Sequence, residues 1–368
     1  MQRRTFLTSL ATAAFFSTIL TFPAQGKPNM NTANTHAQNP TLPVSMVKEW
    51  DKIFPKSDKV THQKVSFKNR YGITLVGDLY IPKNIRGKLP AIAVSGPFGA
   101  VKEQSSGIYA QDLAERGFIT LAFDGSYTGE SGGEPRNVAS PDINTEDFSA
   151  AVDYLSNHDL VNQNAVGILG ICGWGGFALN AAIADTRVKA VAVSTMYDMT
   201  RVMAKGYNDS VDAQGRLKMK QDLNTARTAA FRNNHADLGD PALHLTPQEQ
   251  ITAETPQFVR EYSGFYKTKR GFHPRSINSN SAWTTTNALS FVNMPILQYA
   301  AEMTSPALVV HGGNAHSRYF GEDAFKALGS KNKELVIIPG ATHVDLYDKQ
   351  SGKIPFDKFA AFYKANLK

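Results

Sequence analysis

The chain has 368 residues, of which 42% are hydrophobic and 19% charged, and its single cysteine is Cys172. This length and composition are typical of a globular enzyme and exclude a fibrous or wholly disordered protein. A lone cysteine also excludes an intrachain disulfide. The 39 basic and 32 acidic residues give a formal charge of +7 without a long basic run. Nucleic acid is therefore not expected as a partner.

Residues 1–26 have the pattern of an export signal. Arg3 and Arg4 precede an apolar stretch over residues 10–22, and small residues follow it. Residues 3–7 resemble the twin-arginine leader, with a Sec leader as the alternative. An apolar run of about 13 residues is shorter than the roughly 20 that span a bilayer. We therefore expect cleavage, no membrane anchor in the mature form, and a periplasmic or secreted protein.

The remainder of the chain divides into a linker and an alternating pattern of strands and helices. Residues 27–45 are rich in Asn, Thr, Pro and Gln and are expected to form a flexible linker. Strands are expected at 65–68, 73–81, 91–94, 118–123, 165–169, 188–194, 307–310 and 335–338, and helices at 108–115, 146–157, 178–183 and 356–367. The alternation predicts an α/β fold with a mostly parallel sheet flanked by helices, formed by residues 46–198 and 304–368.

A polar, helical stretch over residues 199–303 interrupts this pattern. Several aromatic side chains are spread along it, namely Tyr207, Phe231, Phe258, Tyr262, Phe265, Tyr266 and Trp283. An insertion of this kind after a central strand is typical of a cap over the ligand-binding edge of the sheet. Residues 199–303 are therefore expected to form a helical cap insertion.

Residues 165–176 read AVGILGICGWGG, an apolar strand that runs through glycines into a helix. This is the context of a nucleophile elbow, in which small neighbours let strand and helix approach closely. With Cys172 at the tip, Gly170 fills the small position before it, but bulky Trp174 stands two residues after it. With Trp174 at the tip, Cys172 and Gly176 are the small neighbours and the elbow has no nucleophile. A thiol at a helix N-terminus is favoured chemically, because the amides lower its pKa.

Several further stretches carry a resemblance to a known family. Besides the elbow and the hairpin expected from the strands 65–68 and 73–81, they are Phe123-Asp124, His311-Gly312 and residues 340–343. With them the chain resembles the α/β-hydrolase superfamily over residues 59–368. Within it the chain looks most like capped, dienelactone-hydrolase-like bacterial proteins, on residues 101–104, 129–133 and 315–317. The resemblance implies a cysteine nucleophile at the elbow, a histidine base and no cofactor.

His343 follows the strand 335–338, where the superfamily keeps its base, and histidine is suited to accept and return a proton near neutral pH. The acid expected about four residues after His311 is replaced by Ala315. Asp198 is the preferred substitute. Glu322, Asp323 and Asp345 are the alternatives.

The amides of Gly173 and Phe98 are expected to form the oxyanion hole, because Pro97 has no N–H. Trp174, His316 and Tyr127 are expected to line the substrate pocket. The carboxylates of residues 124–133 fit no metal-loop spacing, so no metal is expected. The predicted function is hydrolysis of a carboxylic ester, lactone or thioester, with a small-molecule substrate as the partner. The alternative is a non-catalytic or differently catalytic protein of the same fold that binds a small apolar ligand under its cap.

Overall fold

A computed structural model describes residues 44–368. The predicted leader and nearly all of the predicted linker therefore lie outside the described residues. Within 44–368, no helix is long and apolar enough to cross a membrane.

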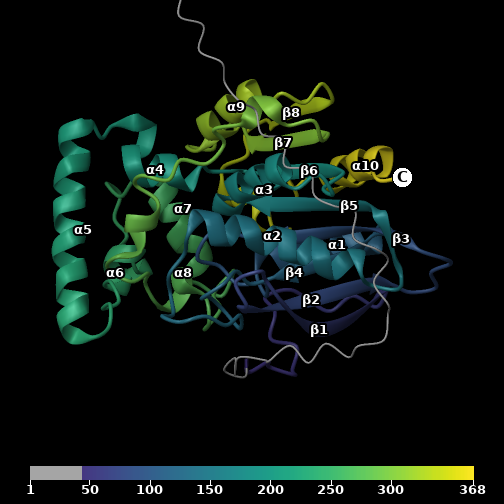
Figure 1. Ribbon diagram of the computed structural model, residues 1–368, viewed down its shortest axis with the longest axis horizontal. Helices are drawn as coiled ribbons and strands as arrows, with labels where there is room; N and C mark the ends of the chain where they lie inside the picture. The colour runs from purple at the N-terminus through teal and green to yellow at the C-terminus, as the bar shows by residue number, and fades with distance from the viewer. Residues whose placement is uncertain (1–43) are drawn as a thin grey trace, which may run out of the picture. The chain divides into compact units, whose positions relative to one another are not determined.

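The centre of the fold is an eight-stranded sheet with the strand order β1-β2-β4-β3-β5-β6-β7-β8 (Figure 1). Pairs β1–β2 and β2–β4 are antiparallel, and the remaining pairs are parallel. The strands are β1 Val60–Lys68, β2 Thr74–Pro82, β3 Leu89–Ser95, β4 Ile119–Phe123, β5 Val161–Ile171, β6 Ala190–Ser194, β7 Ala307–Gly312 and β8 Lys333–Ile338. The predicted α/β fold with its mostly parallel sheet is confirmed.

Helices cover both faces of this sheet. They are α1 Ser105–Glu115, α2 Pro141–Ser156, α3 Gly173–Ala184, α9 Arg318–Ala327 and α10 Phe356–Asn366. Side chains of α2, α3 and α9 belong to one hydrophobic core, and those of α1 and α10 to a second. The strands separate these cores, since Ala91 and Ala93 of β3 face the first while Ile92 and Val94 face the second. A strand buried on both faces explains the continuous apolar runs in the sequence.

The segment between β6 and β7 contains α4 Met199–Lys205, α5 Ala213–Asn233, α6 Pro241–His244, α7 Gln257–Tyr266 and α8 Ile277–Asn280. Figure 1 shows these helices grouped at one end of the sheet, with α5 outermost. None of the residues of α5 is buried. Short 3-10 helices occur at Tyr207–Asp209, Gln248–Gln250, Asn287–Ser290, Ala300–Glu302 and Val344–Leu346.

Candidate active site

Cys172 occupies the turn between β5 and α3. Its backbone has φ 55° and ψ −128°, a conformation that costs a non-glycine residue about 1–3 kcal/mol. The turn is held from both sides, because the Cys172 N–H donates to the Ser194 carbonyl at 3.0 Å and the Cys172 carbonyl accepts from Tyr197 at 2.9 Å. Close packing explains the glycine before it, since a Cβ on Gly170 would lie 2.3 Å from the Trp174 carbonyl oxygen. The tip of the turn therefore carries a thiol.

Trp174, one of the residues predicted for the substrate pocket, lies in the hydrophobic core beneath the turn. Its ring packs edge-on against Phe123, Phe148 and Phe177, each with a centroid distance of 5.6 Å. Room for the indole exists because Gly125 has no side chain; a Cβ there would lie 2.3 Å from the Trp174 ring. The bulk of Trp174 is thus compatible with Cys172 at the tip of the elbow.

Three hydrogen-bond donors surround the thiol. Burial raises the pKa of Cys172, and the Tyr347 hydroxyl and the amides of Gly173 and Phe98 offset part of that rise. The two amides predicted for the oxyanion hole therefore both face the sulfur atom. Because the pKa remains above its ordinary value, the resting residue is a neutral thiol and needs a base to react.

His343 is fully buried and lies beside this turn. Its Nδ1 is 2.9 Å from the Thr195 hydroxyl and 2.5 Å from the Ser317 hydroxyl, and its Nε2 is 3.0 Å from the Tyr347 hydroxyl. Burial lowers the pKa of His343 well below its ordinary value, and the nearby His316 and His311 lower it further. The imidazole is consequently neutral and can act as a base.

Tyr347 connects the two groups. Its hydroxyl is 3.0 Å from Nε2 of His343 and is close enough to the Cys172 thiol to lower the pKa of that thiol. It therefore lies where one oxygen atom would connect sulfur and imidazole. Sequence reasoning missed this residue. A usable signal was its position four residues after His343, around the single turn Val344–Leu346.

The four carboxylates considered as the acid are engaged elsewhere. Asp198 caps α4, accepting from the Arg201 N–H at 2.9 Å and the Thr200 hydroxyl at 2.6 Å. Glu322 pairs with Arg318, Asp323 with Arg201 and Lys326, and Asp345 with Lys353. The structure brings none of them to His343. The hydroxyls of Thr195, after β6, and Ser317, after β7, occupy the place where an acid was expected.

The remaining predicted pocket residues lie apart from the thiol. His316 stacks on Phe258 at 4.6 Å, and its Nε2 is 2.5 Å from the Tyr197 hydroxyl, so it packs behind the site. Burial lowers the pKa of His316 to about 4. Tyr127 lines a different cavity, which also contains Arg227 and Ala230 of α5.

A cavity of about 260 Å³ opens directly on Cys172. Its walls come from the elbow, the loop after β3 and the inserted helices, and they consist of Phe98, Cys172, Tyr197, Met199, Val202, His244, Leu245, Tyr262, Tyr266, Asn278, Trp283 and Tyr347. Most of this surface is aromatic or aliphatic. Residues of the segment 199–303 therefore form part of the wall in front of the thiol.

The insertion also positions the second amide donor. Asn278 of α8 donates from its Nδ2 to the Phe98 carbonyl at 2.8 Å and from its backbone N–H to Gly99 at 3.1 Å. The Ser276 hydroxyl donates to the same Gly99 carbonyl at 3.0 Å. The loop that carries the Phe98 N–H is thus held by three hydrogen bonds from residues 276–278.

Comparison with known proteins shows to which family this chain belongs. The model of the X-Pro dipeptidyl-peptidase (S15) family matches residues 71–345. The chain belongs to the S15 family. Its members share the α/β-hydrolase fold described above, and the alpha/beta hydrolase GrgF from a Penicillium species matches with a TM-score of 0.67 at 21% identity, covering 83% of this chain and 99% of that one. The superfamily resemblance is thereby confirmed, while the dienelactone-hydrolase-like subgroup stays a prediction.

Among individual relatives of this S15-family protein, PA2218 of Pseudomonas aeruginosa is 57% identical over 92% of this chain and 88% of its own length. The crystal structure of PA2218 matches with a TM-score of 0.85, covering 89% of this chain and all of that one. The thiohydrolase aneE of Aspergillus aculeatus is 31% identical over 60% of this chain and 68% of its own length. The relatives with a described activity thus include thiohydrolases and also polyketide transferases, among them grgF of a Penicillium species, which is 34% identical over 40% of this chain and 47% of its own length.

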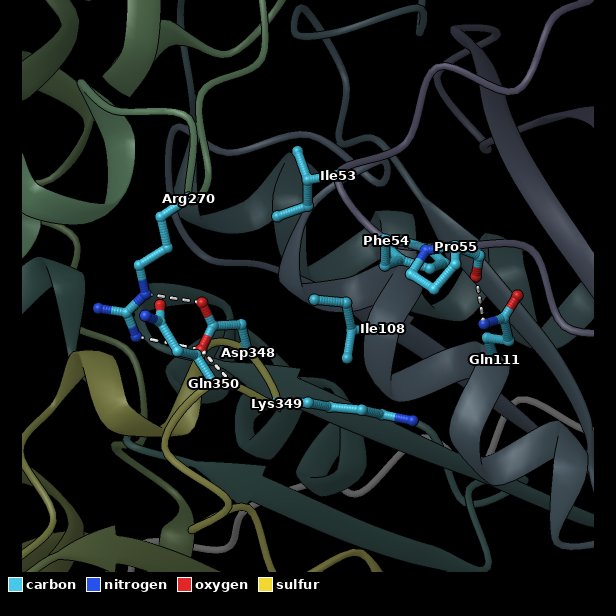
Figure 2. Close-up of a pocket in the computed structure, with 9 residues that line it drawn as sticks. All are labelled: Ile53, Phe54, Pro55, Ile108, Gln111, Arg270, Asp348, Lys349 and Gln350. Carbon is cyan, nitrogen blue, oxygen red and sulfur yellow. Dashed lines mark hydrogen bonds and ion pairs between the residues drawn. The ribbon is translucent and has the colours of Figure 1, made fainter.

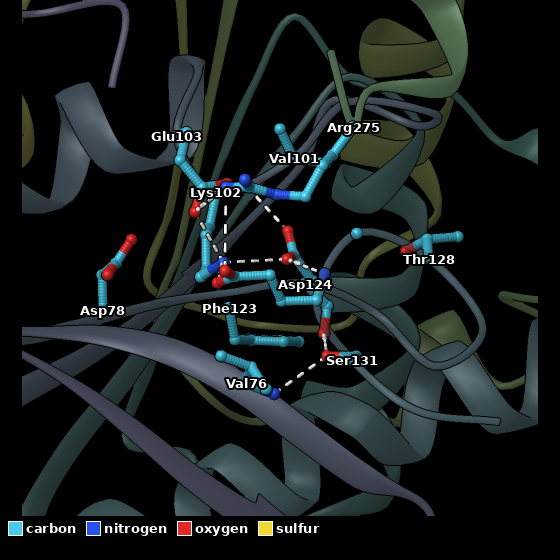
Figure 3. Close-up of polar contacts among 12 residues, drawn as sticks. Val76, Asp78, Val101, Lys102, Glu103, Phe123, Asp124, Thr128, Ser131 and Arg275 are labelled. Carbon is cyan, nitrogen blue, oxygen red and sulfur yellow. Dashed lines mark hydrogen bonds and ion pairs between the residues drawn. The ribbon is translucent and has the colours of Figure 1, made fainter. Parts of the chain in front are cut away.

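A buried charge cluster supports the loops of this S15-family site (Figure 3). The Lys102 ammonium lies 2.7 Å from Glu103, 3.0 Å from Asp124 and 2.6 Å from Glu130. Burial alone would lower the pKa of Lys102, but these carboxylates, with Asp124 foremost, raise it well above its ordinary value. Arg275 joins the cluster at 2.9 Å from Glu103. The cluster ties the loops after β3 and β4 to the insertion.

A third cavity, of about 290 Å³, lies between the segment before β1 and the segment after Tyr347 (Figure 2). Most of its polar side chains are paired: Arg270 binds Asp348 at 2.7 and 3.0 Å, Gln111 donates to the Pro55 carbonyl at 3.0 Å, and Lys349 lies 2.6 Å from Asp112. The Arg270–Asp348 pair holds the residue next to Tyr347.

Proposed function

We propose that this protein hydrolyses carboxylic esters, lactones or thioesters through Cys172. The observation that carries the proposal is the buried thiol at a strained elbow with two backbone amides facing it and a neutral histidine one hydroxyl away. These are the parts that acyl transfer requires, namely a nucleophile, a base and donors for the oxyanion.

In the proposed mechanism, the sulfur of Cys172 attacks the acyl carbonyl while its proton passes to the Tyr347 oxygen and the Tyr347 proton passes to Nε2 of His343. The amides of Gly173 and Phe98 bind the oxyanion of the tetrahedral intermediate. Collapse of this intermediate forms an acyl-thioester on Cys172 and expels the alcohol or thiol, which takes the proton from His343. Water, activated by the neutral His343, then releases the acid and restores the thiol.

The choice of acyl substrates is supported by the cavity and by the relatives. No charged side chain lines the wall around Cys172 in the part of the chain that the structure describes, whereas a peptidase that binds a free N-terminus needs a carboxylate for the cationic amine. The relative in Aspergillus aculeatus is a thiohydrolase. Thioesters and short esters are therefore the first substrates to assay.

The test compares the wild type with Cys172→Ala and His343→Ala on 4-nitrophenyl butanoate and on the pentanoyl thioester of N-acetylcysteamine. We expect each substitution to lower kcat by on the order of 10³-fold or more. Mass spectrometry of quenched wild-type reactions should detect an acyl group on Cys172. Undiminished turnover by Cys172→Ala would overturn the mechanism, and turnover absent from the wild type together with tight binding of an apolar ligand would favour the binding-protein alternative.

We also propose that the protein is exported through its residues 1–26. The support is the arginine pair followed by a short apolar run. N-terminal sequencing of protein recovered from the periplasmic fraction should give a chain that begins near residue 27. Full-length protein confined to the cytoplasm, with the pair intact, would contradict export.

A further inference from the structure

Among the residues that line the cavity in front of Cys172, Tyr266 has a hydroxyl without a hydrogen bond of ordinary length and angle. The side chain is 1% exposed and its oxygen is buried. Burial raises the pKa of Tyr266, and the nearby Asn278 and Tyr347 side chains offset only part of that rise. The other three tyrosines of the cavity are all bonded: Tyr197 with Tyr262 at 3.2 Å, and Tyr347 with His343 at 3.0 Å.

An unpartnered buried hydroxyl is costly, because it has lost its water without gaining a partner. In folded proteins such a group indicates strain, a bound water or ion, or a functional contact such as a ligand that supplies the missing bond. The aromatic core would be served equally well by phenylalanine, since the Tyr266 ring packs against Phe265 and Tyr347 at 4.9 and 6.0 Å. Packing therefore does not explain why this position carries a hydroxyl group.

The surrounding wall restricts what that ligand can be. In the described residues, the lining contains no Asp, Glu, Lys or Arg, and burial lowers the pKa of His244, so this imidazole is neutral as well. A charged acyl group would lose its hydration without a counter-charge in such a space. Since a cavity of about 150 Å³ holds benzene, a volume of about 260 Å³ holds roughly ten non-hydrogen atoms. Every substituent of a bound acyl group therefore lies within several bonds of the reacting carbonyl.

We propose that the Tyr266 hydroxyl is a specificity-determining group that donates a hydrogen bond to an oxygen carried by a short, uncharged acyl group. The substrate class is thereby narrowed to neutral oxo-acyl or alkoxy-acyl esters and thioesters, in preference to plain alkyl ones. This inference rests on the proposed function of Cys172, and it assigns a contact that the reaction itself does not require.

The experiment uses matched thioesters of N-acetylcysteamine, one with a 3-oxopentanoyl and one with a pentanoyl group. Tyr266→Phe should lower kcat/KM for the oxo substrate about tenfold and leave that for the alkyl substrate within about twofold. The control is Tyr80→Phe, since Tyr80 is also fully buried with an unpartnered hydroxyl but lies outside the cavity. Tyr80→Phe should leave the ratio of the kcat/KM values for the two substrates unchanged. An unchanged ratio in Tyr266→Phe, or an equal loss for both substrates, would overturn the inference.

A binding measurement separates this inference from the proposed function. In a Cys172→Ala background, calorimetry with the two ketone isosteres, in which CH₂ replaces the thioester sulfur, needs no turnover. Tighter binding of the oxo isostere that Tyr266→Phe abolishes would support the contact even if Cys172 proved not to be a nucleophile. Equal affinities with and without the Tyr266 hydroxyl would refute it, even if hydrolysis through Cys172 were established.

Discussion

The hydroxyl of Tyr347 lies 3.0 Å from Nε2 of His343 and faces the Cys172 thiol on its other side. The proposed nucleophile and the proposed base are thus joined through a third side chain, which contacts the imidazole and would offer a path for the proton in the proposed mechanism.

Removal of this hydroxyl provides the first prediction. Tyr347→Phe should lower kcat by about 10²-fold, the usual contribution of a positioned proton-transfer group, with little change in KM. Steady-state kinetics on the butanoate ester measure both constants. Tyr80→Phe controls for the loss of a buried hydroxyl elsewhere. Full activity of Tyr347→Phe would mean that Cys172 transfers its proton to His343 directly.

The second prediction concerns the groups near Nδ1 of the His343 imidazole. Ser317→Ala removes a hydroxyl 2.5 Å from Nδ1 of His343 and should lower kcat about tenfold by loosening the ring. Asp198→Ala should instead cost about 1 kcal/mol of stability as a lost helix cap and change kcat by less than about threefold. Chemical denaturation and kinetics on both variants test this contrast. The reverse pattern would restore Asp198 as the acid.

The third prediction concerns the Trp174 indole. Trp174→Ala should lower the free energy of unfolding by about 3–5 kcal/mol, because it empties the space among Phe123, Phe148 and Phe177. Trp283, which lines the cavity and stacks on Phe98 at 4.4 Å, is the matched control. Trp283→Ala should raise KM at a smaller cost in stability. A Trp174→Ala variant as stable as the wild type would show that the indole does not support the core.

The charge cluster provides the fourth. Lys102→Met leaves Glu103, Asp124 and Glu130 buried without their central cation and should cost about 3–5 kcal/mol. Lys218→Met on α5 breaks the exposed pair with Asp222 and should have no measurable effect on urea unfolding. Equal stability of the two variants would contradict the structural role of the cluster.

Buried histidines provide the fifth. Burial lowers the pKa of both His311 and His316 to about 4, so between that pH and the ordinary value near 6.5 the unfolded chain binds more protons than the folded one. Stability should therefore be complete above pH 6.5 and should fall as the pH drops toward 4, by up to about 1.4 kcal/mol per pH unit for each histidine. Urea denaturation at several pH values measures the slope. His311→Gln should flatten it, whereas the same change at exposed His235 should not.

The fold was predictable because its signals are local. Strands such as β3 and β4 are buried on both faces, and their apolar runs identify them without further information. The start of α3 was less predictable from the sequence. It begins at Gly173, five residues earlier than expected, because contacts with Met196 and Tyr197 at the turn override the poor helix propensity of the glycines.

The site was only partly predictable because its decisive contacts are long-range. Cys172, His343, Gly173 and Phe98 stand at recognisable positions relative to the strands. Nothing near Trp174 in the sequence reveals that Gly125, in a distant loop, leaves space for the indole. The partners of Nδ1 were not predictable for a related reason, because they are hydroxyl groups rather than the carboxylate expected there, and hydroxyl groups are too common in a sequence to indicate a site.

Asn278 contributes one further consequence. The same side chain that lines the cavity also donates to the Phe98 carbonyl, so the inserted helices hold the loop of the proposed oxyanion hole as well as part of the cavity wall. Substrate specificity and reaction rate would then both depend on residues 199–303. Transplanting residues 199–303 between relatives would exchange both properties together, and directed evolution of the insertion toward new substrates would alter the turnover number even when every catalytic side chain is retained.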